Sequence, residues 1–489
     1  MLKIIRRVLA AIFLLGITLL FLDFTGASYA WFSWMARLQF FPAVLSGSLV
    51  VVAAIILLTL LFGRLYCSII CPLGVWQDGI ALIGKKVRRN RYRWSPAKTC
   101  LRWASLGLFI LAFILGISLV VCILAPYSSY GRMVASILTP AVRYVNNLIA
   151  SATDSSLVYH RDVWFKTGAV FFISLGSLIL IGTLAWRNGR TWCNTVCPVG
   201  TVLGFLSRFS LLKISIDTDK CVNCGLCARN CKAGCIDFKN HAIDYSRCVA
   251  CMDCIGKCST HAISYGTVRP VKARKAESGS TDAGRRSFMT ATAVIATATA
   301  LEAKKKVDGG LAVIEDKKIP ARSCGIVPPG AESIKNVSRH CTACQLCITA
   351  CPNQVLRPSA SVDSLMQPRS SFERGYCRPE CTRCSHVCPT GAIRPITPAE
   401  KTTISVGHAV WIRDNCIPVT EGHNCTACER HCPTEAITRV PLDPSDPQSV
   451  LVPVVDPSRC IGCGACEYYC PARPLAAMYI EGNSRHITL

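Results

Sequence analysis

Long apolar runs separated by polar loops dominate the first part of this chain of 489 residues. Four runs approach the ~20 apolar residues that a helix needs to cross a bilayer. With 51% hydrophobic positions, the chain is also too apolar to be wholly soluble. The pattern predicts a four-helix transmembrane domain over residues 1–213, with helices within Val8–Leu22, Ala43–Phe62, Trp103–Leu124 and Thr167–Trp186.

Basic residues are unevenly distributed around these runs. The loop between the second and third runs carries Lys85, Lys86, Arg88, Arg89, Arg91, Arg93 and Lys98, and Lys3, Arg6 and Arg7 precede the first run. Because Lys and Arg are enriched in cytoplasmic loops, we expect the amino terminus and this loop in the cytoplasm. The net charge of +25 then reflects membrane orientation and anionic headgroups. No nucleic-acid motif accompanies the charge, so no nucleic-acid partner is expected.

Cysteines replace the apolar runs as the main feature after residue 213. Two Cys-x2-Cys-x2-Cys-x3-Cys motifs lie within residues 214–270, each followed by a strand-like run. Three thiolates within seven residues can hold three corners of an iron-sulfur cube, and the fourth reaches the other cube. Zinc usually takes two ligands from each of two separated strands, so zinc is disfavoured. This segment is predicted to be an α+β bacterial-type two-cluster ferredoxin domain, with ligands Cys221, Cys224, Cys227, Cys231, Cys248, Cys251, Cys254 and Cys258.

Residues 311–489 hold four more groups of four cysteines. The first and last have the same spacing, whereas the middle two have a longer first gap, which a loop insertion would explain. We expect a larger four-cluster ferredoxin-like domain, and hence six [4Fe-4S] clusters in the whole chain. Its predicted ligands are Cys341, Cys344, Cys347, Cys351, Cys377, Cys381, Cys384, Cys388, Cys416, Cys425, Cys428, Cys432, Cys460, Cys463, Cys466 and Cys470.

A Cys-x3-Cys-Pro motif recurs at the ends of the second and fourth apolar runs, as Cys67–Cys71 and Cys193–Cys197. Cysteines at i and i+4 share one helical face, so the two pairs together offer four sulfurs for a metal or for dithiol–disulfide chemistry. The alternative is packing at two buried helix ends. Cys100 and Cys122 are expected to be core residues, and Cys235 is a spare thiol without an assigned role.

Residues 271–310 are predicted to connect two compartments. Arg285 and Arg286 are followed by Phe288, Met289 and a weakly apolar Ala/Thr/Val run, the order of an export signal. The arginine pair resembles the twin-arginine signal of domains that fold before export. The alternatives are a fifth membrane helix or an Ala-rich linker. The export interpretation places residues 311–489 in the periplasm and two of the six clusters in the cytoplasm.

Nearly the whole chain resembles a fusion of two electron-transfer subunits. The paired Cys-x3-Cys-Pro motifs and the first ferredoxin module resemble the NapH-type membrane quinol dehydrogenase component. Arg285-Arg286, the run 327–331 and four cluster motifs resemble the NapG/MauM-type exported ferredoxin subunit. The resemblance implies that the first of the four groups exchanges its fourth ligand with the last, and the second with the third. Cys470 would then join the first group, Cys351 the last, Cys432 the second and Cys388 the third.

The expected function is electron transfer at a bacterial inner membrane. Quinol from the membrane pool would be the donor, and a periplasmic reductase or cytochrome the acceptor. Tyr127, Arg132, His160 and Asp162 are candidates to bind and deprotonate quinol. The alternatives are an accessory protein for metal-cofactor assembly or reduction and a ferredoxin-fed transmembrane relay. A redox sensor is a further alternative, but the lack of a recognisable signalling module argues against it.

Overall fold

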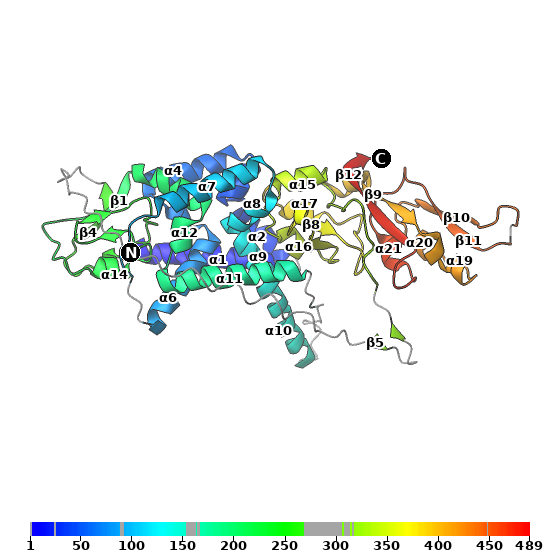
Figure 1. Ribbon diagram of the computed structural model, residues 1–489, viewed down its shortest axis with the longest axis horizontal. Coiled ribbons are helices and arrows are strands. Elements are labelled where there is room, and N and C mark those ends of the chain that lie inside the picture. The colour runs from blue at the N-terminus through cyan, green and yellow to red at the C-terminus, as the bar shows by residue number, and fades with distance from the viewer. Residues whose placement is uncertain are drawn as a thin grey trace.

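The chain folds into three domains arranged along one long axis (Figure 1). The computed structural model describes residues 2–23, 26–88, 92–152, 163, 167–267, 306–307, 313–314, 317–446 and 448–489. A helical domain lies in the middle, a small ferredoxin domain at one end and the larger cysteine-rich domain at the other (Figure 1). The arginine pair of the predicted export signal, His160 and Asp162 lie outside the described residues, so these predictions stay untested.

The helical domain consists of helices that run mostly along the long axis (Figure 1). Its elements are α1 (Leu2–Leu22), α2 (Ala27–Arg37), α3 (Phe40–Leu45), α4 (Leu49–Phe62), α5 (Leu65–Ile69), α6 (Pro72–Arg88), α7 (Thr99–Ile114), α8 (Ser118–Leu124), α9 (Pro126–Met133), the π-helix η1 (Val134–Leu138), α10 (Thr139–Ala152), α11 (Gly168–Asn188), α12 (Thr191–Thr195), α13 (Pro198–Leu206) and the 3-10 helix η2 (Ser207–Phe209).

All four predicted apolar runs are helical, but only two of them form continuous long helices. Among the described residues, α1 and α11 are long and apolar enough to cross a membrane, and a third span results if the bent pair Ser118–Leu124 and Pro126–Ala152 counts as one. The second run is divided between α3 and α4 after Gly47 (φ +68°), and the third between α7 and α8 at Gly116 (φ +73°). Glycine ends helices readily in this left-handed conformation.

The ferredoxin domain contains the two predicted strand-like runs. It comprises β1 (Leu212–Ile216), α14 (Leu226–Asn230), β2 (Ile236–Asp237), β3 (Ala242–Ile243), the 3-10 helix η3 (Ile255–Lys257) and β4 (Ile263–Thr267). Antiparallel β1–β4 and β2–β3 pairs frame the cysteine loops. This is the short-strand, short-helix pattern expected for residues 214–270.

The cysteine-rich domain is built from short elements joined by loops. Its longest pair, β9 with β12, is antiparallel. Its elements, together with β5 and β6 before it, are β5 (Lys306–Val307), β6 (Val313–Ile314), α15 (Ile334–His340), α16 (Leu346–Ala350), β7 (Leu356–Pro358), η4 (Val362–Ser364), β8 (Pro368–Ser370), α17 (Arg383–Val387), α18 (Pro398–Thr402), β9 (Ile404–Trp411), η5 (Arg413–Asn415), α19 (Ile417–Thr420), α20 (Ala427–Arg430), β10 (Ile437–Pro441), β11 (Leu451–Val455), α21 (Ala465–Tyr469) and β12 (Met478–Thr488).

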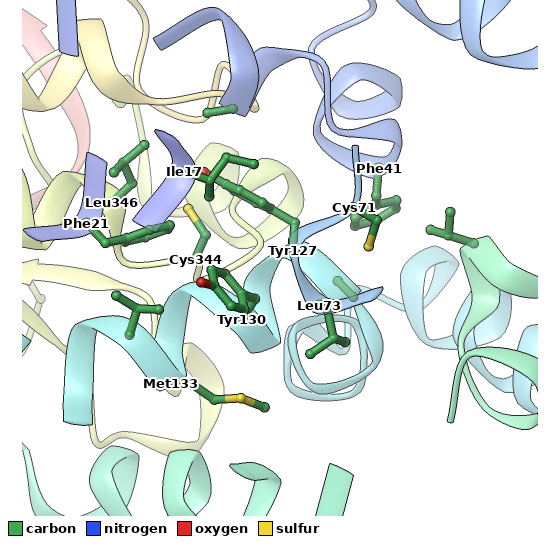
Figure 2. Packing of buried hydrophobic residues seen from close by; sticks show 14 of the residues in the cluster. Ile17, Phe21, Phe41, Cys71, Leu73, Tyr127, Tyr130, Met133, Cys344 and Leu346 are labelled. Carbon is green, nitrogen blue, oxygen red and sulfur yellow. The ribbon is translucent and has the colours of Figure 1, made fainter. Parts of the chain in front are cut away.

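One hydrophobic cluster joins all three domains. It extends from Val249 and Cys251 of the ferredoxin domain, through Cys71 of the helical domain, to Cys344 and Cys347 of the cysteine-rich domain. Figure 2 shows part of it, with Cys344 beside the aromatic side chains of α1 and α9. Such apolar contact excludes water from both junctions.

Candidate functional site

The two Cys-x3-Cys-Pro motifs form one buried centre in the helical domain. Cys67, Cys71, Cys193 and Cys197 are each 4–5% exposed and close enough to interact electrostatically. The predicted sharing of one helical face is wrong, because each second cysteine lies in a break between two helices. Proline suits the first position of a helix, so α6 and α13 begin directly after these cysteines.

An arginine from each motif crosses to the other motif. Arg64 Nη2 donates to the carbonyl oxygen of Cys193 at 3.3 Å, and Arg190 Nη1 donates to that of Cys67 at 2.6 Å. Both guanidinium groups are fully buried. Two buried cations beside four thiols supply the positive charge that a set of thiolate ligands would need.

Two glycines permit this close crossing. A Cβ at Gly74 would stand 2.4 Å from the carbonyl oxygen of Cys67, and one at Gly200 would stand 2.1 Å from that of Cys193. Each carbonyl oxygen belongs to the glycine's own motif, and the arginine from the other motif is almost as near, at 2.7 Å for Arg190 Nη1 and 2.9 Å for Arg64 Nη2. Real Cβ atoms do not make such close contacts, so any side chain here would displace the carbonyl oxygen and the crossing arginine. The repeated glycine is therefore a packing requirement of the paired centre.

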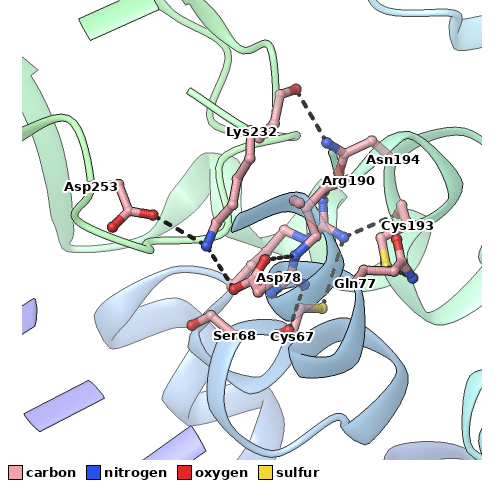
Figure 3. Close-up of polar contacts among 12 residues, drawn as sticks. Cys67, Ser68, Gln77, Asp78, Arg190, Cys193, Asn194, Lys232 and Asp253 are labelled. Carbon is pink, nitrogen blue, oxygen red and sulfur yellow. Dashed lines mark hydrogen bonds and ion pairs between the residues drawn. The ribbon is translucent and has the colours of Figure 1, made fainter. Parts of the chain in front are cut away.

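A buried ion-pair network connects this centre to the ferredoxin domain (Figure 3). Asp78 pairs with Arg190 at 2.6 Å, with Lys232 at 2.7 Å and with Arg6 at 3.4 Å. Lys232 also pairs with Asp253 at 3.2 Å. Lys232 stands where many ferredoxins have proline after the fourth cysteine, and the network gives this departure a physical reason.

The end of the first cluster motif and the segment just before the second lie next to the centre. The backbone nitrogen of Arg190 donates to the carbonyl oxygen of Lys232 at 2.8 Å, and Arg64 Nη1 donates to that of Ser246 at 3.0 Å. Lys232 directly follows Cys231, and Ser246 precedes Cys248 by two residues. These two segments are therefore the part of the ferredoxin domain that contacts the paired centre.

The ligand exchange predicted within the ferredoxin domain is visible for Cys231. Burial raises the pKa of Cys254, and the neighbouring charges of Cys251, Cys231 and Cys248 raise it further. Cys231 therefore lies with the second group. Cys235 contacts Cys231 at 3.5 Å between sulfurs, which places the spare thiol at the edge of the same group.

The implied exchange in the cysteine-rich domain is wrong for its first two groups. A cleft is lined by Cys351 together with Cys377, Cys381 and Cys384, so Cys351 completes the second group and not the last. Burial raises the pKa of Cys347, and the neighbouring charges of Cys341, Cys344 and Cys388 raise it further. Cys388 therefore completes the first group.

The third and fourth groups exchange in the same way. A second cleft is lined by Cys416, Cys425, Cys428 and Cys470, and Cys432 interacts with Cys460 and Cys463. Neighbouring motifs in the chain thus interlock as they do in a two-cluster ferredoxin. The physical reason is chain continuity, because each fourth cysteine lies within reach of the adjacent loop.

The four groups form a path away from the helical domain. The first group contacts α8 and α9, since Cys122 Sγ lies 3.9 Å from the carbonyl oxygen of Cys341. The second group adjoins the fourth, because the nitrogen of Cys377 donates to the carbonyl oxygen of Cys463 at 2.9 Å. The third group, with α19 and the β10–β11 pair, lies toward the far end of the molecule (Figure 1).

Two of the four candidate quinol-binding residues instead face the first group. Tyr127 and Arg132 are 2% and 1% exposed. The Tyr127 hydroxyl has no hydrogen-bond partner among the described residues and interacts with Cys344 and Cys388. Figure 2 shows the Tyr127 side chain near Cys344. Both are too deeply buried to meet a ligand from the bilayer, so the structure does not support that role for them.

The two isolated cysteines differ from each other. Cys122 is fully buried, as predicted, whereas Cys100 is exposed at the start of α7, so its core assignment is wrong. The first turn of α7 turns this position outward, which the apolar composition of the run could not reveal.

The cysteine groups fit iron-sulfur clusters better than single metal ions. Within the described ranges, no three His, Cys, Asp or Glu side chains converge closely enough for one metal ion. The thiolates of a cube each bind a different iron and therefore stand further apart. Cys351 and Cys470 close two clefts of this kind, so the donor chemistry and the spacing agree.

Sequence reasoning missed the residues around the four buried thiols. Arg64 and Arg190 follow Gly63 and Gly189, so the repeat begins with Gly-Arg three residues before each first cysteine. That recurrence could have identified both arginines. Asp78 has no counterpart in the repeat, because Gly204 occupies the equivalent position.

Comparisons with protein families identify 4Fe-4S domains in three parts of the chain. A family described as "4Fe-4S binding domain" matches residues 45–90 and 167–217, which contain both Cys-x3-Cys-Pro motifs. Another family with that description matches residues 214–237. A "4Fe-4S dicluster domain" family matches residues 423–473, which include most of the third and fourth groups.

Individual relatives carry ferredoxin-type names. The methylamine utilization ferredoxin-type protein MauM of Methylobacillus flagellatus is 32% identical over 166 residues, 33% of this chain and 70% of that protein. The ferredoxin-type protein NapF of Escherichia coli K12 is 28% identical over 162 residues, 33% of this chain and 89% of NapF. The putative electron transport protein YccM of the same strain is 26% identical over 197 residues, 39% of this chain and 47% of YccM. No solved structure matches significantly.

Proposed function

Because this chain belongs to the MauM family of ferredoxin-type proteins, we propose that it is a membrane-bound quinol dehydrogenase component. It would take electrons from quinol in a bacterial inner membrane and pass them to a periplasmic reductase or cytochrome. The observation that carries this proposal is the path of cysteine groups from the helical domain to the far end of the molecule.

The long axis of the molecule suits a membrane crossing. The two longest apolar helices run along it (Figure 1), so a bilayer around the helical domain would separate the two cysteine-bearing domains. A hydrocarbon layer of ~30 Å is too thick for direct contact between them. The four buried thiols of the helical domain adjoin the ferredoxin domain and would supply an intermediate redox or metal-binding centre at that side of the layer.

The residues of the cysteine groups fit a chain of one-electron carriers. When bound, a [4Fe-4S] cluster takes up or gives up one electron. Cys341, Cys344, Cys347 and Cys388 would hold the cluster nearest the helical domain, and the third group would hold the cluster nearest the acceptor. Lys401 Nζ donates to the carbonyl oxygens of Arg378 and Cys381 at 2.5 and 2.6 Å, which fixes the loop of the second group.

A quinol titration followed by electron paramagnetic resonance (EPR) tests this function. Anaerobically purified protein should contain about 24 irons in six clusters, and menaquinol or ubiquinol should reduce several of them. Cys67→Ser or Cys193→Ser should impair reduction of the two-cluster ferredoxin domain while all six clusters still assemble. Reduction by a reduced ferredoxin but by no quinol would replace this proposal with the ferredoxin-fed relay. Normal behaviour of both variants would assign the four thiols a structural role.

A further inference from the structure

A basic cleft lies where the helical domain meets the ferredoxin domain. Its volume is about 280 Å³, which is room for roughly ten water molecules. Its walls come from α1, α6, α14 and η3. Among the described residues, five cations and one carboxylate line it, namely Lys3, Arg7, Lys85, Lys232, Lys257 and Asp253. A cleft lined mainly by charges of one sign concentrates ions of the opposite sign, so this cleft suits an anion.

Asp253 is too small a counter-charge for these cations. It pairs with Lys3 at 3.3 Å, with Arg7 at 3.1 Å and with Lys232 at 3.2 Å. Asp78 also pairs with Lys232, but two arginines share that carboxylate. The wall of the cleft therefore keeps an excess of positive charge after its ion pairs have formed.

Lys85 and Lys257 have no carboxylate partner among the described residues. Lys85 Nζ donates to Asn230 Oδ1, which is a neutral oxygen. Burial lowers the pKa of Lys85, and the neighbouring charge of Lys257 lowers it further. The two ammonium groups therefore repel each other within the cleft. An anion bound between them would replace this repulsion by attraction.

The cations of the cleft come from both domains. Lys3, Arg7 and Lys85 belong to the helical domain, whereas Lys232 and Lys257 belong to the ferredoxin domain. Like charges on two facing domains oppose their contact, and an anion in the cleft removes that opposition. A ligand that needs cations from both domains binds the docked arrangement and stabilises it by mass action.

The helices that carry these cations also expose apolar side chains next to them. Lys3 and Arg7 lie in the first turns of α1, one of the two helices long and apolar enough to cross a membrane. Ile4 and Val8, which follow them, are 67% and 53% exposed, and Leu82 in the wall of the cleft is 49% exposed. The amino terminus lies at the ferredoxin end of the helical domain (Figure 1). Basic pockets beside the ends of membrane helices hold the headgroups of anionic lipids.

We propose that this cleft binds the phosphate of an anionic phospholipid, which thereby holds the ferredoxin domain on the helical domain. The inference rests on the membrane position in the proposed function and not on quinol as the electron donor. The phosphate oxygens accept hydrogen bonds from Lys85 and Lys257, and the acyl chains lie against Leu82 and the exposed apolar side chains of α1. A small concave site favours a headgroup over an acidic protein, which would need a broader contact surface.

A double variant tests this site in the full-length, cluster-loaded protein in lipid nanodiscs. Lys85→Gln with Lys257→Gln removes the two cations that lack a carboxylate. Lys220→Gln with Lys239→Gln is the matched control, because both lysines are exposed on the ferredoxin domain and neither lines the cleft.

Hydrogen exchange reports how tightly the ferredoxin domain is docked. Phosphatidylglycerol at about ten times its dissociation constant should slow exchange in residues 214–267 about tenfold relative to phosphatidylcholine alone. The unaltered protein and the control should both respond in this way. The double variant should lose the response, and in phosphatidylcholine it should exchange no faster than the unaltered protein because the repulsion between the two lysines is gone. A response that persists in the double variant would overturn the site.

Calorimetric titration of the detergent-solubilised protein identifies the source of the phosphate. Dihexanoylphosphatidylglycerol should bind the unaltered protein and the control equally. It should bind the double variant about 25-fold more weakly, because each cation near an anionic lipid contributes about fivefold. Equal affinity for inorganic phosphate would overturn the assignment to a lipid.

The same protein distinguishes this inference from the proposed function. If phosphatidylglycerol has no effect while quinol still reduces the clusters, the lipid site is overturned and the proposed function stands. If no quinol reduces the clusters while phosphatidylglycerol still slows exchange, the lipid site stands and the proposed donor is overturned.

Discussion

The two ends of the helical domain hold their cysteine-bearing domains by opposite physical means. At the ferredoxin end, Asp78, Arg190 and Lys232 form a buried ionic contact. At the other end, Gly131 and Tyr127 pack against Cys344 and Phe21 in an apolar contact. Ion pairs fix orientation because each charge needs its partner, whereas apolar packing excludes water. The ionic junction therefore specifies which loop of the ferredoxin domain docks, and the apolar junction keeps water away from the first cysteine group.

Breaking the ionic contact should have the largest effect. Asp78→Asn would leave Arg190, Lys232 and Arg6 without their shared carboxylate. Removal of one partner from a buried ion pair costs about 3–5 kcal/mol. Hydrogen exchange should therefore accelerate in residues 214–267 and remain unchanged in the cysteine-rich domain. Asp253→Asn is the control, because Asp253 is more exposed and Asp78 still pairs with Lys232 in that variant. Equal effects of the two substitutions would refute the central role of Asp78.

Overfilling the apolar contact should have a smaller effect at the opposite end. A Cβ at Gly131 would stand 2.5 Å from the carbonyl oxygen of Cys344 and 2.7 Å from Phe21. Gly131→Ala should cost about 1–3 kcal/mol and alter the EPR signal of the first cluster, while the ferredoxin domain stays docked. Gly176→Ala, in α11 where a Cβ meets no atom within 4 Å, should leave that signal unchanged. A changed signal in both variants would argue against a local contact.

The exposed ion pair at the edge of the ionic contact should contribute least to the stability of the docked ferredoxin domain. Arg7 pairs with Asp253 at 3.1 Å, but its side chain is 46% exposed. Exposed pairs contribute about 0.2–1 kcal/mol and weaken with salt. Arg7→Gln should therefore accelerate exchange in residues 214–267 only slightly, and only at low ionic strength. A large effect that persists in high salt would show that the rim is stronger than its exposure indicates.

Short-range patterns predicted much of this molecule. Cysteine spacing predicted the 4Fe-4S character of the domains, and the recurring Cys-x3-Cys-Pro motif indicated a paired centre whose four thiols do lie together. The breaks at Gly47 and Gly116 were missed because hydropathy reports composition and not backbone conformation.

The contacts that join the domains could not be read from the sequence. Lys85 and Lys257 are far apart in the chain, and only the fold brings them to one cleft. The same holds for Asp78 and Lys232, whose charges alone look like solvated surface residues. The exchange of fourth cysteines also depends on which loops lie side by side, and the family resemblance suggested different neighbours.

The interlocking of neighbouring motifs has a consequence for genetics and spectroscopy. Because Cys351 completes the second group and Cys388 the first, replacement of either would damage the cube of the adjacent motif and not its own. If each variant of a fourth cysteine were assumed to damage the cluster of its own motif, its EPR signal would be assigned to the wrong cluster, and the same error would recur in every group. Exchanging the assignments of the first group with the second, and of the third group with the fourth, would correct this error.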